Sequence, residues 1–159
     1  MIWVNARAII ERITNNKTEV IVQWRNKNNA NCWEFPGGTV EECESFFAAV
    51  KREVKEETGL DITFVTGQNN RFQIGEIECF KPYSVYQTVR EGGGFDSMGV
   101  HFICSATGEL LLEGDDTKDI KWIGLDELKK LVETENLFLS IDKVAAVAYL
   151  KEKGYTFSI

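Results

Sequence analysis

Residues 38–60 read GTVEECESFFAAVKREVKEETGL, and this stretch decides the fold. A turn opens it, because residues 36–38 are Pro-Gly-Gly: proline fixes one backbone dihedral and glycine permits the positive φ that follows. Residues 44–58 favour helix, and Gly59 stands where a C-terminal cap is expected. The stretch therefore predicts a tight turn that leads into one long helix.

The predicted helix presents faces of different character. At about 100° per residue, its bulky apolar side chains fall on one arc that would pack on a core, namely Phe46, Phe47, Val50 and Val54. Lys51 and Lys55 point to the opposite side, toward water. Glu53, Glu56 and Glu57 are spaced i, i+3, i+4 and share one face, which overlaps the edge of the apolar arc.

The three carboxylates on one face create a conflict of charge. Like charges this close repel, and partial desolvation strengthens the repulsion. A divalent cation resolves the conflict, and hard oxygen ligands suit Mg²⁺ or Mn²⁺. The alternative is a solvated acidic helix face. Two residues favour the metal site: Glu44 lies near the carboxylate side at the helix start, and Arg52 flanks the cluster as a fixed guanidinium.

Residues 38–60 follow the pattern G-x5-E-x7-R-E-U-x-E-E-x-G-U, where U is a bulky aliphatic residue. This pattern resembles the Nudix box, the signature of hydrolases that cut nucleoside diphosphates linked to another group with Mg²⁺ or Mn²⁺. The resemblance implies an α/β fold of the Nudix type, an α/β/α sandwich with a twisted mixed sheet and a loop-helix-loop catalytic motif. The length fits a single Nudix hydrolase domain over residues 1–159.

The resemblance implies a set of metal ligands. Glu53, Glu56 and Glu57 would hold Mg²⁺, for which Mn²⁺ should substitute. The backbone of Gly37 or Gly38 would supply a further oxygen, and Gly37 is also a candidate for substrate binding. Such ions bridge phosphate oxygens, neutralise developing charge and lower the pKa of a bound water.

The resemblance also implies structural and catalytic roles. Arg52 would orient the box glutamates by salt bridging, and Glu44 and Gly59 would complete the structural part of the motif. The general base is Glu53 or Asp116, with Glu53 preferred. Asp116 belongs to the acidic segment at residues 113–116, which could equally be a solvated turn.

Several other residues are candidates for substrate binding or catalysis, and each also has a purely structural alternative. Arg25 closes the second predicted strand, where relatives place a phosphate-contacting arginine, but it could be a surface arginine. His101 is expected to be packed and hydrogen-bonded, and Asn136 to be a loop or cap residue instead of a reader of a purine edge. Three aromatic residues could stack on a base, although core packing is the commoner role: Trp24, Tyr83 and Phe95.

Composition narrows the function further. The net charge is −7 and no basic stripe is visible, so a nucleic-acid polymer is not the expected partner. The four cysteines form no C-x2-C pair and there is one histidine, which argues against a zinc site. We find no signal peptide and no apolar segment of membrane-spanning length, and a cytoplasmic protein with reduced thiols is expected.

The substrate class stays open between several nucleotides. Residues 33–38, WEFPGG, are similar to the MutT-like branch, which hydrolyses nucleoside triphosphates to monophosphates. The alternatives are an ADP-ribose or nucleotide-sugar pyrophosphatase, and a non-catalytic nucleotide-binding module. RNA end processing is disfavoured by the acidic balance. Since many relatives are dimers, a homodimer is one option.

The remaining elements follow from pattern and turn residues. Strands are predicted at residues 4–13, 19–24, 61–66, 71–74, 83–89, 100–105, 109–112 and 119–123. Helices are predicted at residues 126–132 and 140–153, the second capped by Ser140 and ended by Gly154. Residues 26–31 and 91–97 are predicted loops.

Overall fold

The computed structural model describes residues 1–27, 30–94 and 96–158. Phe95, a candidate for base stacking, lies outside the described residues. The strands of the main sheet are β1 (Ile2–Thr14), β2 (Lys17–Lys27), β3 (Ala30–Glu34), β4 (Gly37–Thr39), β5 (Asp61–Val65), β8 (Ser84–Thr88), β9 (Asp96–Thr107), β10 (Glu113–Gly114) and β11 (Thr117–Gly124).

The sheet is mixed and follows the order β10-β11-β2-β1-β9-β5. Strand β3 pairs with β2, β4 with β1 and β8 with β9. The β1–β9 pair is parallel, whereas β1 is antiparallel to β2 and β4. A separate hairpin of β6 (Phe72–Ile74) and β7 (Ile77–Cys79) follows the 3-10 turn η1 (Gln68–Asn70).

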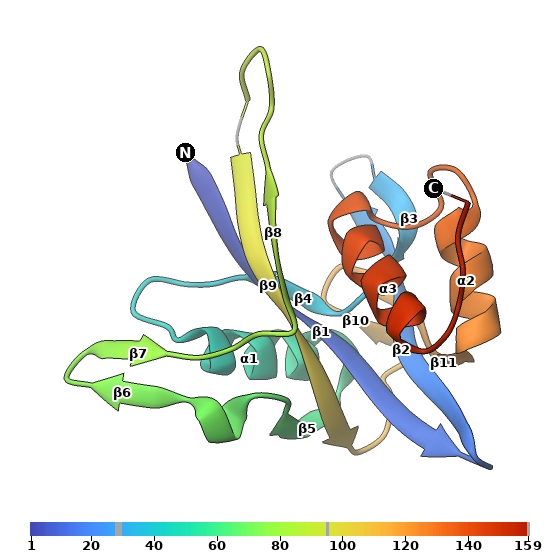
Figure 1. The fold of residues 1–159 in the computed structure, drawn as a ribbon, viewed down its shortest axis with the longest axis horizontal. Coiled ribbons are helices and arrows are strands. Elements are labelled where there is room, and N and C mark those ends of the chain that lie inside the picture. Colours follow the sequence, from blue (N-terminus) through green and yellow to red (C-terminus); the bar gives the residue numbers. More distant parts are fainter. Residues whose placement is uncertain (28–29, 95, 159) are drawn as a thin grey trace.

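Helices cover both faces of the sheet (Figure 1). Helix α1 (Phe46–Thr58) packs on one face, against a core that includes Ala6, Ala8 and Ile10 of β1. Helices α2 (Leu125–Glu133) and α3 (Ser140–Glu152) pack on the other face, in a core that includes Ile9. Side chains alternate along a strand, so β1 feeds both cores. The α/β class and the mixed sheet are confirmed.

Strand β4 runs unusually close to β1. Gly37 pairs with Arg7 and Gly38 with Ala6, and the Ala8 N–H donates to the Pro36 carbonyl at 2.8 Å. A Cβ on Gly37 would lie 2.5 Å from the Arg7 Cα, and Gly37 has a φ of 151°, so only glycine fits there. The tight turn predicted at residues 36–38 is only partly right: the chain bends at Pro36, but Gly37 and Gly38 belong to strand β4, and residues 40–45 separate this strand from α1. The segment from Pro36 to Gly38, called the glycine turn below, lies directly against the first strand.

Helix α1 agrees with the sequence apart from its start. It begins at Phe46 instead of Glu44, because Ser45 is the N-cap and accepts the Ala48 N–H at 3.0 Å. Gly59 is the C-cap with a φ of 82°, as predicted. The apolar arc is confirmed, since Phe47, Val50 and Val54 are buried.

Some predicted boundaries are wrong. Residues 109–112 form no strand: the Leu111 N–H donates to the Thr58 carbonyl at 2.9 Å, so this segment follows the end of α1. The loop predicted at residues 91–97 is shorter, because strand β9 starts at Asp96. In the loop predicted at residues 26–31, β2 continues to Lys27 and β3 begins at Ala30, and residues 28–29 are not among the described residues. Ser140 is no cap, since Leu139 holds the N-cap position of α3.

Among the described residues, no helix has both the length and the apolar character that crossing a membrane would need.

Two serines test the cap assignment. We expect Ser45→Ala to lower the free energy of unfolding by about 1 kcal/mol, because the Ala48 N–H loses its acceptor. Ser140→Ala is the matched control, since no side-chain cap bond forms at the start of α3. Urea denaturation measures both. Equal losses in the two variants would contradict the assignment.

Candidate active site

Arg52 joins three glutamates on the exposed side of α1. Its Nε and Nη2 donate to the two oxygens of Glu44 at 2.7 and 2.9 Å. Its Nη1 donates to Glu53 at 2.9 Å and to Glu56 at 3.3 Å, and Nη2 also reaches the Thr39 carbonyl at 3.1 Å. The hydrogen bond from Arg52 lowers the pKa of Glu44 to about 2. Arg52 therefore links Glu44, which precedes α1, to Glu53 and Glu56 of the helix.

Glu53 lies between helix and turn. A Cβ on Gly38 would lie 2.5–2.6 Å from the carboxyl atoms of Glu53, so this carboxylate rests directly on the glycine backbone. Burial raises the pKa of Glu53, and the charge of Glu56 adds to the rise, while Arg52 opposes it. A carboxylate in this position is suited to accept a proton.

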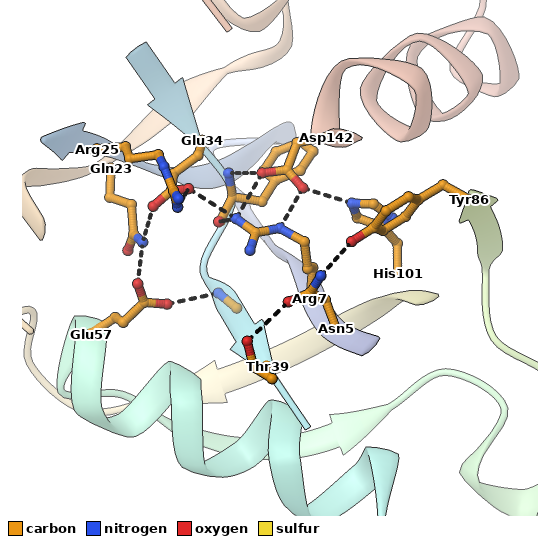
Figure 2. Close-up of polar contacts among 12 residues, drawn as sticks. Asn5, Arg7, Gln23, Arg25, Glu34, Thr39, Glu57, Tyr86, His101 and Asp142 are labelled. Atoms are coloured by element: carbon orange, nitrogen blue, oxygen red, sulfur yellow. Dashed lines mark hydrogen bonds and ion pairs between the residues drawn. The ribbon is translucent and has the colours of Figure 1, made fainter. Parts of the chain in front are cut away.

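Glu57 is turned into the protein (Figure 2). Its side chain is buried, Oε1 accepts the Gly37 N–H at 2.7 Å and Oε2 accepts Gln23 Nε2 at 2.9 Å. Burial, followed by the charge of Glu34, raises the pKa of Glu57 to about 8. The three box glutamates therefore occupy different environments, although they share one side of the helix.

The described residues contain no ready-made cluster of three or more His, Cys, Asp or Glu side chains placed to hold a metal. The three carboxylates have different donors: Glu57 turns to the Gly37 N–H, while Glu53 and Glu56 turn to Arg52.

The donor chemistry nevertheless fits a hard divalent cation, because carboxylate oxygens border the turn backbone. Gln23 Oε1, on the amide that contacts Glu57, is a buried acceptor that has no hydrogen-bond partner among the described residues.

The cationic side of the site lies on β2. Arg25 Nη1 donates to Glu34 at 3.1 Å and its side chain is 18% exposed, so it is a partly buried residue and not a free surface arginine. Lys27, two residues along the same strand, is exposed, and its charge lowers the pKa of Glu53 against the larger effect of burial. Positive charge therefore stands close to the box carboxylates.

Asp116 belongs to a loop that packs on the end of α1. Thr117 Oγ1 donates to the Glu57 carbonyl at 3.3 Å, and Gly114 approaches Glu57 so closely that a Cβ there would collide with its backbone. Asp116 itself is exposed and has a φ of 55°. The loop is thus next to Glu57, while the Asp116 carboxylate faces water.

The other candidates have packing roles in the structure. His101 is fully buried, and its Nε2 lies 2.7 Å from Asp142 Oδ1, which confirms the expected packed and hydrogen-bonded histidine. Trp24 packs edge-on against Trp33 at 5.3 Å between ring centroids. Tyr83 packs likewise on Tyr149.

Asn136 lies outside the helices and strands, at a φ of 60°, and borders a cavity of about 420 Å³. The cavity lies between the start of β3, including Asn31 and Cys32, and the segment that enters α3, including Phe138.

A buried ionic cluster was missed from the sequence. Arg7 and Asp142 are buried and bonded to each other, and Arg7 also donates to Glu34 (Figure 2). The available signal was Arg7 itself, a charge that stands between Ala6 and Ala8 in the predicted strand, because a buried arginine needs a partner.

Comparison with known proteins gives a consistent result. The model of the NUDIX domain family matches residues 4–140. Over 117 residues the chain is 32% identical to an ADP-ribose pyrophosphatase of Methanocaldococcus jannaschii, covering 72% of this chain and 60% of that protein. Over 117 residues it is 29% identical to an 8-oxo-dGTP diphosphatase of Buchnera aphidicola, covering 74% of this chain and 75% of that protein.

The fold has close counterparts among solved structures. The NUDIX domain of Shewanella oneidensis NrtR, crystallised with ADP ribose, superposes with a TM-score of 0.69 at 15% identity, over 96% of this chain and 88% of that one. The chain spans three fifths of the archaeal relative, and shorter matches to proteins of Danio rerio and Arabidopsis thaliana cover 12–18% of their length.

Alanine at the two glycines of the turn should have different effects. Gly37→Ala would place a methyl 2.5 Å from the Arg7 backbone, so we expect a loss on the order of 2 kcal/mol or more in the free energy of unfolding. Gly38→Ala would meet only the flexible end of Glu53, which can swing away. We expect a nearly unchanged melting temperature and weaker Mn²⁺ binding, measured by calorimetry. If Gly37→Ala and Gly38→Ala destabilised the protein equally, the Glu53 side chain would not have moved away from the new methyl group, and the prediction would be wrong.

Glu57 should make the metal-free protein less stable as the pH rises. A carboxyl whose pKa is raised on folding stabilises the fold fully below its unfolded pKa, and this contribution is lost as the pH rises through the folded value. With the pKa raised from 4.5 to about 8, we expect stability in EDTA to fall across that range. The loss should be on the order of a few kcal/mol.

Glu57→Gln should remove most of this pH dependence, because glutamine does not titrate. Urea denaturation at several pH values in EDTA measures both proteins. The same slope in the two proteins would assign the pH dependence to other groups.

Proposed function

The chain belongs to the Nudix hydrolase family, as the box predicted, and from this premise we propose that it hydrolyses a diphosphate bond in a small nucleotide. The substrate would be a nucleoside diphosphate linked to another group, and water would cut the bridge between two of its phosphorus atoms, releasing a nucleoside monophosphate and the remaining phosphate-bearing half. The proposal assigns Mg²⁺ as the cofactor, with Mn²⁺ able to substitute. A nucleic-acid polymer is not the proposed substrate, since the net charge is −7.

One observation carries the proposal: the box has all its carboxylates, Glu53 and Glu57 border the glycine turn, and Arg52 is bonded to Glu44, Glu53 and Glu56. A module that only binds nucleotides would not need all of these acids. Their retention favours an enzyme over the non-catalytic alternative. Cytoplasmic location and a homodimer stay predictions.

The proposed roles follow from the environments. Glu53, Glu56 and Glu57 would hold the cation together with a backbone oxygen of the turn at Gly38. When bound, the ion would neutralise charge on the phosphate oxygens and lower the pKa of a bound water. Glu53 would accept the proton of the attacking water on its carboxylate, because partial burial favours its protonated form. Asp116, in the loop beside Glu57, is the second candidate for the base.

We assign substrate binding to the residues of β2 and of the glycine turn that lie near the box carboxylates. Arg25 and the exposed Lys27 would contact phosphate oxygens, and the Gly37 backbone would border the same space. The cavity beside Asn31 and Asn136 is polar at its rim and adjoins β3. Nucleoside triphosphates and ADP-ribose are the two classes to test first, because the relatives named above act on an oxidised triphosphate and on ADP-ribose.

The test is product release from a panel of nucleoside triphosphates, ADP-ribose, nucleotide sugars and dinucleoside polyphosphates, with Mg²⁺ and with EDTA. We expect metal-dependent turnover of one class, and Glu53→Gln should lower kcat by about 100-fold or more, because it removes the proposed base and a metal ligand. Arg25→Ala should raise KM for the same substrate.

Glu42→Gln is the matched control. Glu42 is exposed and is one of the residues of the box whose identity the pattern does not specify. The variant should keep full activity. Wild-type activity in Glu53→Gln would disprove the assignment of Glu53. No metal-dependent turnover of any compound, together with tight nucleotide binding, would favour the non-catalytic module.

A further inference from the structure

We propose that the buried Arg7–Asp142 pair is a positioning device for the Glu57 carboxylate; this rests on the proposed function, in which Glu57 is a metal ligand. The residues come from opposite ends of the chain, β1 and α3. In the described part of the chain, no direct hydrogen bond joins either of them to a box glutamate. Their influence would pass through Phe35 and Glu34.

The pair has a defined geometry. Arg7 Nε donates to Asp142 Oδ1 at 2.6 Å and Arg7 Nη2 donates to Asp142 Oδ2 at 3.0 Å. The Arg7 side chain is 3% exposed and that of Asp142 is fully buried. Two parallel bonds between a planar guanidinium and a carboxylate fix orientation as well as distance. His101, 2.7 Å from Asp142 Oδ1, supports the carboxylate from β9.

The pair holds both backbone groups of Phe35. The Phe35 N–H donates to Asp142 Oδ2 at 2.9 Å, and Arg7 Nη2 donates to the Phe35 carbonyl at 2.6 Å. Two residues later, the Gly37 N–H donates to Glu57 Oε1 at 2.7 Å. The Pro36–Gly37 peptide, which carries this N–H, therefore lies one residue after Phe35, whose N–H and carbonyl are both held.

A second chain of contacts reaches the other oxygen of Glu57. Arg7 Nη2 donates to Glu34 Oε2 at 3.0 Å, and Gln23 Nε2 donates to Glu34 Oε1 at 3.2 Å. The same Gln23 amide donates to Glu57 Oε2 at 2.9 Å. Both oxygens of Glu57 are thus oriented through contacts that converge on Arg7 (Figure 2).

Stability alone does not require this pair. Replacing a buried ion pair by apolar residues of similar volume is often neutral or stabilising, because desolvation offsets the attraction. Apolar side chains would fill the space but could not orient the Phe35 peptide or Glu34. What the pair adds is direction, and residues that orient metal ligands typically change metal affinity or activity by about 10–100-fold when they are lost.

Asp142→Asn is the decisive variant, because it keeps the shape of a residue that contacts none of the proposed ligands. Asparagine has one acceptor oxygen where aspartate has two, so its NH2 group would face a donor in either orientation: Arg7 Nε in one, Arg7 Nη2 and the Phe35 N–H in the other. The clamp would lose bonds in both cases. We expect Mn²⁺ affinity, measured by electron paramagnetic resonance, to fall about tenfold. With the best substrate of the panel, kcat should fall and KM should change less than about twofold.

Val132→Ala is the matched control. Val132 is a buried residue of α2 in the core between α2, α3 and the sheet, far in sequence from the turn. It should lower the melting temperature while Mn²⁺ affinity stays within about twofold of wild type, as expected for a core cavity away from the site. If Asp142→Asn does not fold, the paired replacement Arg7→Met with Asp142→Leu takes its place, because it leaves Glu34 bonded to Arg25.

A double-mutant cycle with Glu57→Gln decides the route of the effect. If the clamp acts through Glu57, adding Asp142→Asn to Glu57→Gln should weaken Mn²⁺ binding by less than about twofold more. A full further tenfold loss would overturn the proposal. So would an Asp142→Asn protein whose Mn²⁺ affinity matches that of Val132→Ala. A wild-type protein that neither binds Mn²⁺ nor turns over any compound would instead refute the proposed function.

Discussion

The close approach of β4 to β1 at Gly37 is the constraint on which the rest of the structure depends. The two backbones lie so near that a Cβ would stand 2.5 Å from the Arg7 Cα. Since no side chain intervenes, the Gly37 N–H can reach Glu57 from one side while Gly38 supports the Glu53 carboxylate. The α1 glutamates therefore meet the backbone of β4 itself, while the apolar side chains of α1 pack on the core of the same face.

Two arginines compensate the acidic groups at different depths. Arg52 is partly exposed and bonds Glu44, Glu53 and Glu56 at the outer edge. Arg7 is buried; although burial opposes its charge, Asp142 and Glu34 hold its pKa above the ordinary value. Arginine suits both places because its guanidinium stays charged and its planar fork matches carboxylates. The same chemistry therefore serves orientation at the surface and in the interior.

Local features could be predicted from the sequence, and distant ones could not. The apolar arc of α1 and the cap at Gly59 each depend on residues a few positions apart. The pairing of Gly37 and Gly38 with β1 was not predicted, because its partners lie about 30 positions earlier in the chain. The pairing of Arg7 with Asp142 joins residues 135 positions apart, so the sequence showed an arginine between two alanines of β1 but gave no sign of its partner. Helical spacing placed three glutamates on one side but could not show that Glu57 turns inward, because this depends on Gly37 and Gln23 from the sheet. Ser140 shows the same limit, since tertiary packing decides where α3 starts.

The box glutamates differ in burial, and burial decides which of them can exchange its hydrogen-bond partner for a cation. Glu56 and Glu53 have side chains 45% and 17% exposed, and their bonds to Arg52 are of the kind that contributes little to stability near water. Glu57 is held by buried donors whose loss would leave it unsatisfied. An arriving cation could therefore compete with Arg52 for the outer carboxylates without disturbing the inner one. In the proposed site, Glu57 would thus be the ligand held in place and Glu53 and Glu56 the ligands able to turn, so cation affinity would depend on the buried network around Glu57 as well as on the box.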